Sequence, residues 1–369
     1  MGCRRDRPEA SRMSRGSVRA TSLISDNRVG LLLLIVVLVA LIGSLKPMFF
    51  SPAFVIGPML TSIAIFTVVG LAQMVVLSVG QMNLAVGGMA AIGAMGSAMI
   101  FQAFDVPLIV GILVGLAFGG AVGALCGVLI AYAGVNSFVV TLAMSFALLG
   151  LVPAVYSWVS TGNAITVQTP GLAELGRSKL SDLCLGDVCG PDGIPLILFV
   201  ALAAMIVIGL LFARSRVGRE ILLTGSNDRA ALLSAIPVPR RIITVHTLSG
   251  ALAALAGFML GASTGSFTPG IGQEFMLQSF LGPILGGTLL AGGYVSVIGT
   301  FLGITLTVVI RQGLLLFGVG IEGLNILLGT ILLIALSADR IRSVTGARSR
   351  LRSARADTTV KTEEKAVVS

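Results

Sequence analysis

The chain has very few charged residues for its length. Of its 369 residues only 11% are Asp, Glu, Lys or Arg, whereas 55% are apolar. A soluble domain carries about 25% charged residues, so this composition excludes an ordinary water-soluble protein. The 47 glycines suit closely packed membrane helices, in which small residues let backbones approach one another.

Groups that carry out catalysis or bind metals are also scarce. His246 is the only histidine, and no nucleophile, base and orienting group occur together. The phosphate-binding pattern G-x-x-x-x-G-K-[ST] is absent, because none of the four lysines follows a glycine. We therefore expect no enzyme activity, no metal site and no cofactor bound by this chain, and any energy for transport must come from another subunit.

Ionisable groups are rare inside the apolar stretches. An ion-coupled carrier usually needs buried acids at mid-membrane, and no such cluster is present. Only Arg311 is embedded, at a cost of at least about 2.5–3.5 kcal/mol, so we predict that Arg311 and Gln312 line a solute pathway. The alternatives are that Arg311 reaches the outer interface or pairs internally with Glu274 or Glu322.

About ten apolar stretches, each long enough to cross a bilayer of roughly 30 Å, fill residues 29–338. Within hydrocarbon the backbone must satisfy its own hydrogen bonds, which favours helices. The sequence therefore predicts an all-α polytopic membrane protein with about ten transmembrane helices. The expected spans are 29–46, 53–79, 84–102, 107–131, 138–159, 195–213, 242–265, 275–292, 294–318 and 321–338.

Positive charge is concentrated in three segments. Of the 25 Lys and Arg residues, seven lie in 1–28, six in 214–241 and eight from 339 onward. The positive-inside rule places all three in the cytoplasm, and ten crossings satisfy this while leaving 160–194 outside. The predicted organisation is a basic cytoplasmic tail (1–28), a transmembrane domain (29–338) and a disordered cytoplasmic tail (339–369). The arginines lack interleaved aromatics, so the tails are assigned to solvent and lipid and not to nucleic acid.

The external loop 160–194 contains two of the four cysteines, Cys184 and Cys189. An oxidising compartment allows them to form a disulfide. The alternative is two free thiols.

Two glycine-rich stretches, 80–88 and 286–293, interrupt the apolar pattern. Glycines at membrane depth let a helix break, so that backbone groups and nearby amides line a polar cavity. Gln81 and Asn83 are therefore candidate pathway residues for a neutral, hydroxylated solute. Close packing of helices through small residues explains each stretch equally well.

The polar segment 225–241 predicts a short amphipathic helix on the cytoplasmic face. Ser226 or Asn227 is a suitable N-cap, and Asp228 in the first turn complements the helix dipole. Pro237 and Pro239 are expected to end it. A helix this short is marginal alone, so it is expected to dock in a partner's groove or lie on the membrane surface.

Four stretches together resemble the ribose-type permease subunit of bacterial ATP-binding-cassette importers, a superfamily that includes branched-chain amino acid permeases. Residues 79–87 read V-G-Q-M-N-L-A-V-G, similar to the family's G-G-I-D-L-S-V-G. Residues 137–142 are similar to P-F-I-x-T-L, and 225–236 to G-x-N-x-x-A-A-x-x-x-G-I. Residues 274–293 are similar to the family's E-L-x-x-I-A followed by G-G-T and a second Gly-Gly. Asn83 replaces the family's Asp and Ala85 the following Ser, which affects the choice of solute more than the fold.

The resemblance implies a type II importer-like permease in a bacterial inner membrane, with both termini cytoplasmic. It implies a homodimer, an extracytoplasmic solute-binding protein and two ATPase subunits that hold ATP and Mg²⁺. The implied pathway residues include Phe138, Thr141 and Glu274. The implied ATPase-coupling residues are Ser226, Asn227, Asp228, Arg229, Ala230, Ala231 and Ile236.

The expected function is ATP-driven import of a sugar or sugar-like polyol. One alternative is an ATP-binding-cassette permease for a nucleoside or a branched-chain amino acid. The others are an ion-coupled secondary transporter and a membrane scaffold or receptor that transports nothing.

Overall fold

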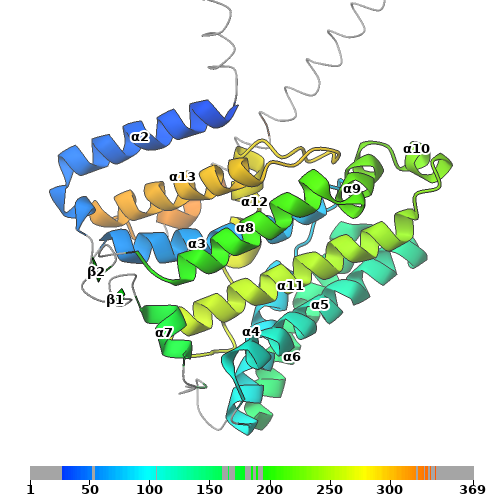
Figure 1. Ribbon diagram of the computed structural model, residues 1–369, viewed down its shortest axis with the longest axis horizontal. Coiled ribbons are helices and arrows are strands. Elements are labelled where there is room, and N and C mark those ends of the chain that lie inside the picture. The colour runs from blue at the N-terminus through cyan, green and yellow to red at the C-terminus, as the bar shows by residue number, and fades with distance from the viewer. Residues whose placement is uncertain are drawn as a thin grey trace, which may run out of the picture.

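The computed structural model describes residues 27–51, 55–104, 106–159 and 194–320, with short pieces of 165–189 and 323–337. This part of the chain is almost entirely helical (Figure 1). Among the residues described, eight helices are long and apolar enough to cross a membrane. They are α2 (Asn27–Leu45), α3 (Gly57–Leu77), α4 (Val86–Ala103), α5 (Leu108–Ala133), α6 (Ser137–Val159), α8 (Ile197–Arg214), α11 (Val238–Thr264) and α13 (Val297–Leu316). The predicted all-α polytopic class is confirmed.

One expected span is wrong in its length. In place of a crossing at 275–292, the structure has the 11-residue helix α12 (Phe275–Leu285). At 1.5 Å per residue, α12 is about 16 Å long, roughly half a hydrocarbon core. After it the chain turns through Gly287, whose φ is +82°, and Leu289 N donates to Tyr294 O to form a hairpin at 286–296. The expected tenth span, 321–338, lies largely outside the described residues.

The short elements lie at two opposite ends of the bundle. Helix α7 (Leu172–Arg177) and the paired strands β1 (Cys184–Leu185) and β2 (Val188–Cys189) lie at one end, and α9 (Arg216–Ser226) and α10 (Asp228–Leu233) at the other (Figure 1). A 3-10 turn, η1 (Pro47–Phe50), follows α2. The described elements of 160–194 (α7, β1 and β2) and those of 214–241 (α9 and α10) therefore lie at different ends, as the predicted topology requires.

Burial separates central helices from peripheral ones. In α3 and α4, 78% and 72% of the membrane-length window is buried, whereas the value for α2 is 11%. A helix that is apolar all round and covered on every side belongs to the centre of a membrane bundle. Helices α3 and α4 are therefore the scaffold against which the candidate site is built.

Helices α5 and α11 pack through glycines along their length, side by side in Figure 1. A Cβ at Gly119 would lie 2.6 Å from the Cβ of Ala254, and one at Gly123 would lie 2.9 Å from the carbonyl carbon of His246. Backbones approach this closely only where side chains are absent, as in membrane helix pairs with small residues at the interface. This contact fixes α11 relative to the rest of the bundle.

Candidate functional site

A polar cavity lies between α3, the N-terminus of α12 and α13, and we call it the outer cavity. Its volume is about 490 Å³. Three predicted site residues meet here, namely Glu274, Arg311 and Gln312. The other lining residues are Ser62, Ile65, Phe66, Leu260, Gly270, Gly272, Gln273, Phe275, Val308 and Leu315.

Arg311 forms an ion pair with Glu274 across the outer cavity. Arg311 Nη2 lies 3.4 Å from Glu274 Oε2, and the guanidinium carbon lies 6.0 Å from the centroid of the Phe66 ring. The internal partner that the sequence left open is thus Glu274; Glu322, the other candidate, lies outside the described residues. The Glu274 side chain keeps 63% of its surface exposed, so the pair is wet on one side.

The polar groups in and beside the outer cavity suit contact with water or a polar solute. Gln278 Nε2 donates to Glu274 Oε2 at 3.3 Å, while the buried Gln278 Oε1 has no hydrogen-bond partner among the described residues. Charged and amide groups exposed at membrane depth face an aqueous cavity or a partner and not lipid. A cavity with both donors and acceptors is suited to a solute rich in hydroxyl groups.

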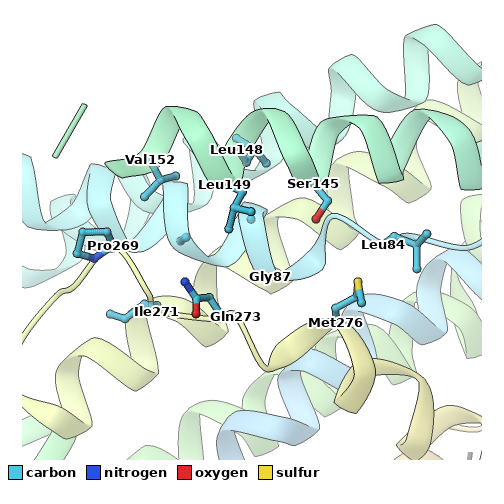
Figure 2. A pocket seen from close by; sticks show the side chains of 12 residues that line it. Leu84, Gly87, Ser145, Leu148, Leu149, Val152, Pro269, Ile271, Gln273 and Met276 are labelled. Carbon is cyan, nitrogen blue, oxygen red and sulfur yellow. The ribbon is translucent and has the colours of Figure 1, made fainter. Parts of the chain in front are cut away.

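A smaller cavity of about 310 Å³ lies between α4, α6 and segment 269–276, and we call it the inner cavity (Figure 2). Gln273 and Ser145 supply polar side chains to a mostly apolar wall that also contains Leu84 and Met276. Gln273 lines both cavities, so the two meet at this segment. Sequence reasoning missed Gln273 and Ser145; the only signal for Gln273 was its position next to Glu274.

Gln81 and Asn83 lie outside the lining of both cavities. Gln81 Oε1 is 2.9 Å from Nε2 of His246. Asn83 is completely buried; its Nδ2 donates to Ser249 Oγ at 3.0 Å and its Oδ1 accepts from Ala85 N at 2.9 Å. Asn83 thus links the α3–α4 connection to α11, and a direct role for either residue in the pathway stays a prediction.

Phe138 and Thr141 also lie away from the lining of the two cavities. The Thr141 hydroxyl is fully buried, accepts from Leu84 N at 3.1 Å and donates to Ser137 O at 2.7 Å. Phe138, at the start of α6, has 48% of its surface exposed. Thr141 therefore positions the loop that carries Leu84 to the inner cavity, while contact of either residue with solute stays a prediction.

Helix α10 begins where the sequence predicts. Asn227 is the N-cap, with its side chain accepting from Ala230 N at 3.1 Å, and Asp228 opens the first turn. Of the two candidate caps, Ser226 instead donates to Leu222 O at 2.8 Å.

The expected end of α10 is wrong. The helix stops at Leu233, because Ala235 adopts φ +59°. Pro237 and Pro239 lie at the start of α11, where their missing N–H groups cost nothing.

We call α9 and α10 together the foot. Its tip is apolar and open, with Leu232 57% and Leu233 90% exposed. Ala231 and Ile236, two predicted coupling residues, are instead buried against Val238, where they hold the tip in shape. An exposed apolar tip of this kind is typical of a docking surface.

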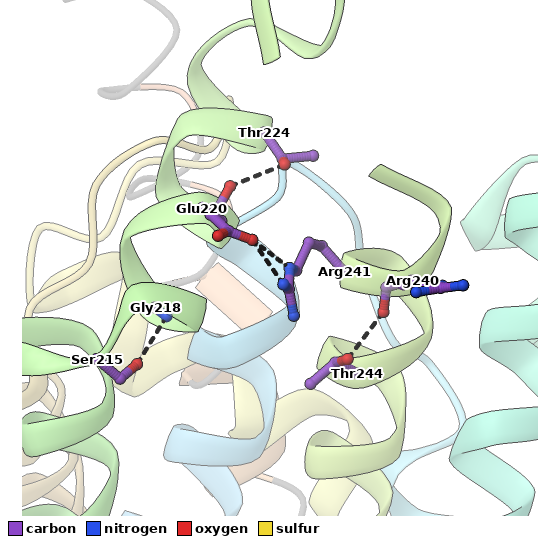
Figure 3. Close-up of polar contacts among 7 residues, drawn as sticks. All are labelled: Ser215, Gly218, Glu220, Thr224, Arg240, Arg241 and Thr244. Carbon is purple, nitrogen blue, oxygen red and sulfur yellow. Dashed lines mark hydrogen bonds and ion pairs between the residues drawn. The ribbon is translucent and has the colours of Figure 1, made fainter. Parts of the chain in front are cut away.

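Helix α9 is held to the bundle by polar contacts (Figure 3). Ser215 caps it by accepting from Gly218 N at 2.8 Å. Glu220 Oε2 accepts from both Nε and Nη2 of Arg241, at 2.7 and 2.6 Å, which ties α9 to the start of α11. No helix was predicted at 216–226; the missed signal was Ser215, a suitable N-cap, followed by the apolar pair Ile221 and Leu222.

The strands β1 and β2 place the backbones of Cys184 and Cys189 directly opposite one another. Opposed residues in an antiparallel pair have Cα atoms about 4.5–5.5 Å apart, within the range that a disulfide spans. The register is compatible with the bond, which stays a prediction.

Comparison with known proteins identifies the family. The model for "Branched-chain amino acid transport system / permease component" matches residues 55–336. The chain belongs to this family.

Several relatives of this permease are bacterial importer subunits. It is 31% identical to the ribose import permease protein of Bacillus subtilis (strain 168) over 319 residues, which cover 86% of this chain and 94% of the relative. The L-arabinose ABC transporter permease protein of Azospirillum brasilense is 30% identical over 86% of this chain and 88% of the relative. The autoinducer 2 import system permease protein of Photorhabdus temperata is 30% identical over 66% and 69%. No solved structure matches the chain.

These findings confirm the resemblance to ribose-type permeases. The permease is a multi-pass membrane protein and a transport subunit. The foot, the two cavities and the short helix α12 all lie within the region that the family model matches.

Proposed function

We propose that the chain is the membrane-spanning subunit of an ATP-binding-cassette importer for a sugar or sugar-like polyol. The observation that carries this proposal is the similarity, over 86% of the chain, to permeases named for ribose and L-arabinose. The polar outer cavity supports it, because Gln273, Glu274, Arg311 and Gln312 offer donors and acceptors that suit hydroxyl groups.

The energy in this proposal comes from a separate ATPase subunit, which binds ATP and Mg²⁺ and docks on the foot. The exposed Leu232 and Leu233 are the apolar anchors of the docking surface. Asp228 and Arg229 supply charge beside them. Closure of two ATPases then moves the foot and alternates access to the pathway, a conformational coupling and not catalysis by this chain.

The proposed assembly has a second copy of this chain and an external solute-binding protein. The exposure of Glu274 supports a second copy, because a carboxylate that is 63% exposed at the outer cavity must face water or a protein partner and not lipid. The solute-binding protein would dock at the end that carries α7, opposite the foot (Figure 1). The proposed location is a bacterial inner membrane with both chain termini in the cytoplasm, and the three basic segments support this orientation through the positive-inside rule.

Reconstitution tests the proposal. Vesicles containing the permease with a candidate ATPase and a candidate solute-binding protein from the same genome are supplied with radiolabelled ribose, arabinose, a polyol, a nucleoside or leucine. We expect uptake of a sugar or polyol that requires ATP and all three components. Uptake of leucine or a nucleoside alone would reassign the solute, whereas accumulation by the permease alone on an ion gradient would overturn the importer.

A further inference from the structure

Three segments that are far apart in the sequence meet beside the foot. They are the α3–α4 connection at Gly80, the last turn of α9 at Gly225, and the hairpin after α12 at Gly292 and Gly293. Gly293 N donates to Ser78 O at 2.9 Å, which joins the first segment to the third. We call this meeting point the glycine junction.

The glycine junction has no room for side chains. A Cβ at Gly225 would lie 2.7 Å from Gly293 N and closer still to Ser78 O. A Cβ at Gly292 would lie 2.6 Å from Gly80 N and 2.8 Å from Gly225 O. Three backbones are therefore in direct contact, without a flexible side chain that can absorb displacement. Close-packed interiors of this kind transmit strain.

The first segment leads from the junction to the inner cavity. Beyond Gly80 the chain is fixed to α11 by the Asn83–Ser249 hydrogen bond. Leu84 in this connection and Gly87 in the first turn of α4 then line the inner cavity. A Cβ at Gly87 would lie 2.5 Å from Gly272 O, so α4 rests directly on segment 269–276, which separates the two cavities.

The third segment leads to the outer cavity. The hairpin at 286–296 connects Gly292 back to α12, whose N-terminal end carries Glu274 and Met276. Glu274 lines the outer cavity and Met276 the inner one. The segment that lines the inner cavity and the segment that lines the outer cavity therefore both lead to the glycine junction.

The remaining partner in the junction is the foot itself. Gly225 is the second-last residue of α9, and only Asn227 separates α9 from α10. The Glu220–Arg241 ion pair holds the other face of α9 to α11. The end of α9 thus lies between the docking surface and the two segments that lead to the cavities.

We propose that the glycine junction is the contact through which movement of the foot reaches both cavities, with Gly225 as its positioning residue. This inference rests on the proposed function, because it requires an ATPase that moves the foot. It adds a definite location: force enters through backbone contact at Gly225 and divides between the α3–α4 connection and the α12 hairpin.

Substitution of Gly225 by Ala tests the junction in the full complex. Gly225 has ordinary helical geometry, so the added methyl acts through the contact and not through backbone strain. Gly209→Ala is the matched control, since Gly209 is also helical and a Cβ there would meet no atom within 4 Å. Coupling between sites is typically worth about 5–150-fold, so we expect uptake per ATP hydrolysed to fall about tenfold in Gly225→Ala. The amount of ATPase that co-purifies with Gly225→Ala should equal that of the unsubstituted protein. Gly209→Ala should match the unsubstituted protein in both ATPase co-purification and uptake.

Three results would overturn the inference. They are coupled uptake by Gly225→Ala at the unsubstituted level, an equal loss in Gly209→Ala, or a loss of uptake that only follows a loss of bound ATPase. The last result would give Gly225 a role in shaping the docking surface instead. If the unsubstituted complex itself shows no ATP-driven uptake, the proposed function has failed. If that complex shows normal ATP-driven uptake and one of the three results above is obtained, only the inference about the junction has failed.

A distance measurement supports the test without a substitution in the junction. Spin labels are placed on the exposed Leu223 of the foot, which is not one of the proposed anchors, and on Leu289 of the hairpin, with Phe146 on α6 as the reference. Between nucleotide-free and nucleotide-trapped complexes, the Leu223–Leu289 distance should stay constant while the Leu223–Phe146 distance changes. Equal changes in both distances would show that the foot moves without the hairpin, which contradicts the proposal even if Gly225→Ala fails to assemble.

Discussion

Arg311 and Glu274 join α13 to the start of α12 across the outer cavity, with 3.4 Å between Nη2 and Oε2. Because the carboxylate is mostly exposed, the pair should contribute less than about 1 kcal/mol to stability. The pair matters more for solute binding than for stability, since it places a cation and an anion where a solute would pass. The pair therefore allows a structural role to be separated from a solute-binding role.

We expect Arg311→Ala to raise the KM for uptake at least about tenfold while thermal stability changes little, because a charge-assisted hydrogen bond to solute is worth roughly 1.5–3 kcal/mol. Radiolabelled uptake and a melting curve in detergent measure the two quantities. The exchanged variant Glu274→Arg with Arg311→Glu restores the pair but not the positions of donor and acceptor. Full recovery of KM in that variant would mean that the pair only braces the helices.

Asn83 should matter for stability. Asn83→Ala removes the hydrogen bond to Ser249 and leaves Ala85 N without its partner, both in a fully buried place. A buried group left unsatisfied costs about 1–3 kcal/mol, so we expect a clear fall in melting temperature. Ser249→Ala breaks the same bond from the other side, so it should lose less because Ala85 N keeps its partner. A melting temperature unchanged by Asn83→Ala would refute the linking role.

Glu220 and Arg241 should stabilise the foot relative to α11. Their side chains are 20–28% exposed and held by two short hydrogen bonds, so the pair is worth about 1 kcal/mol at most. Since 1.4 kcal/mol corresponds to about tenfold in affinity, Glu220→Gln should weaken ATPase binding by no more than about fivefold. The exchange Glu220→Arg with Arg241→Glu tests pairing, and a weakening beyond about tenfold in Glu220→Gln would indicate direct contact with the ATPase.

The membrane class and the start of α10 were predictable because they depend on local properties. Hydrophobic length identifies spans without knowledge of their packing, and Asn227 followed by Asp228 is a local capping signal. The length of α12 was not predicted, because residues 275–292 are mostly apolar and the glycine-rich stretch that begins at Gly286 was compatible with either a helix break or close helix packing. The helix ends there because Gly286 must approach Gly299 and Gly287 takes a positive φ, which are tertiary requirements.

The site shows the same division. Arg311 and Gln312 were found because charge and amides are rare at membrane depth, whereas Glu274 was implied by the resemblance to ribose-type permeases. Asn83 met the same criterion but is used to link two segments, and sequence alone cannot tell an amide that faces a cavity from one that faces a buried serine. Gln273 shows the opposite error, since its place between the cavities depends on how α4 rests on segment 269–276.

Cys184 and Cys189 should form a disulfide in the mature protein. In intact cells, a membrane-impermeant maleimide should label neither residue until a reductant is added, and both afterwards. The buried Cys126 serves as the internal control, because it should remain unlabelled throughout. Labelling of the two loop cysteines before reduction would establish the alternative of two free thiols.

The apolar tip of the foot should determine ATPase docking. Leu233 is 90% exposed in the isolated chain, so Leu233→Asp should leave folding intact while it removes an apolar anchor from the docking surface. Anchors of this kind are worth about 2 kcal/mol or more, so co-purification of the ATPase should fall at least about tenfold. Leu233→Met keeps the apolar contact and is the matched control.

Reversal of charge in Asp228→Lys with Arg229→Glu should weaken association as well, through the electrostatic fit of the two surfaces. Because α10 is capped by Asn227, neither change alters its N-cap. Normal ATPase retention by both Leu233→Asp and the charge-reversed variant would show that the ATPase binds elsewhere, and the foot would then lose its proposed role.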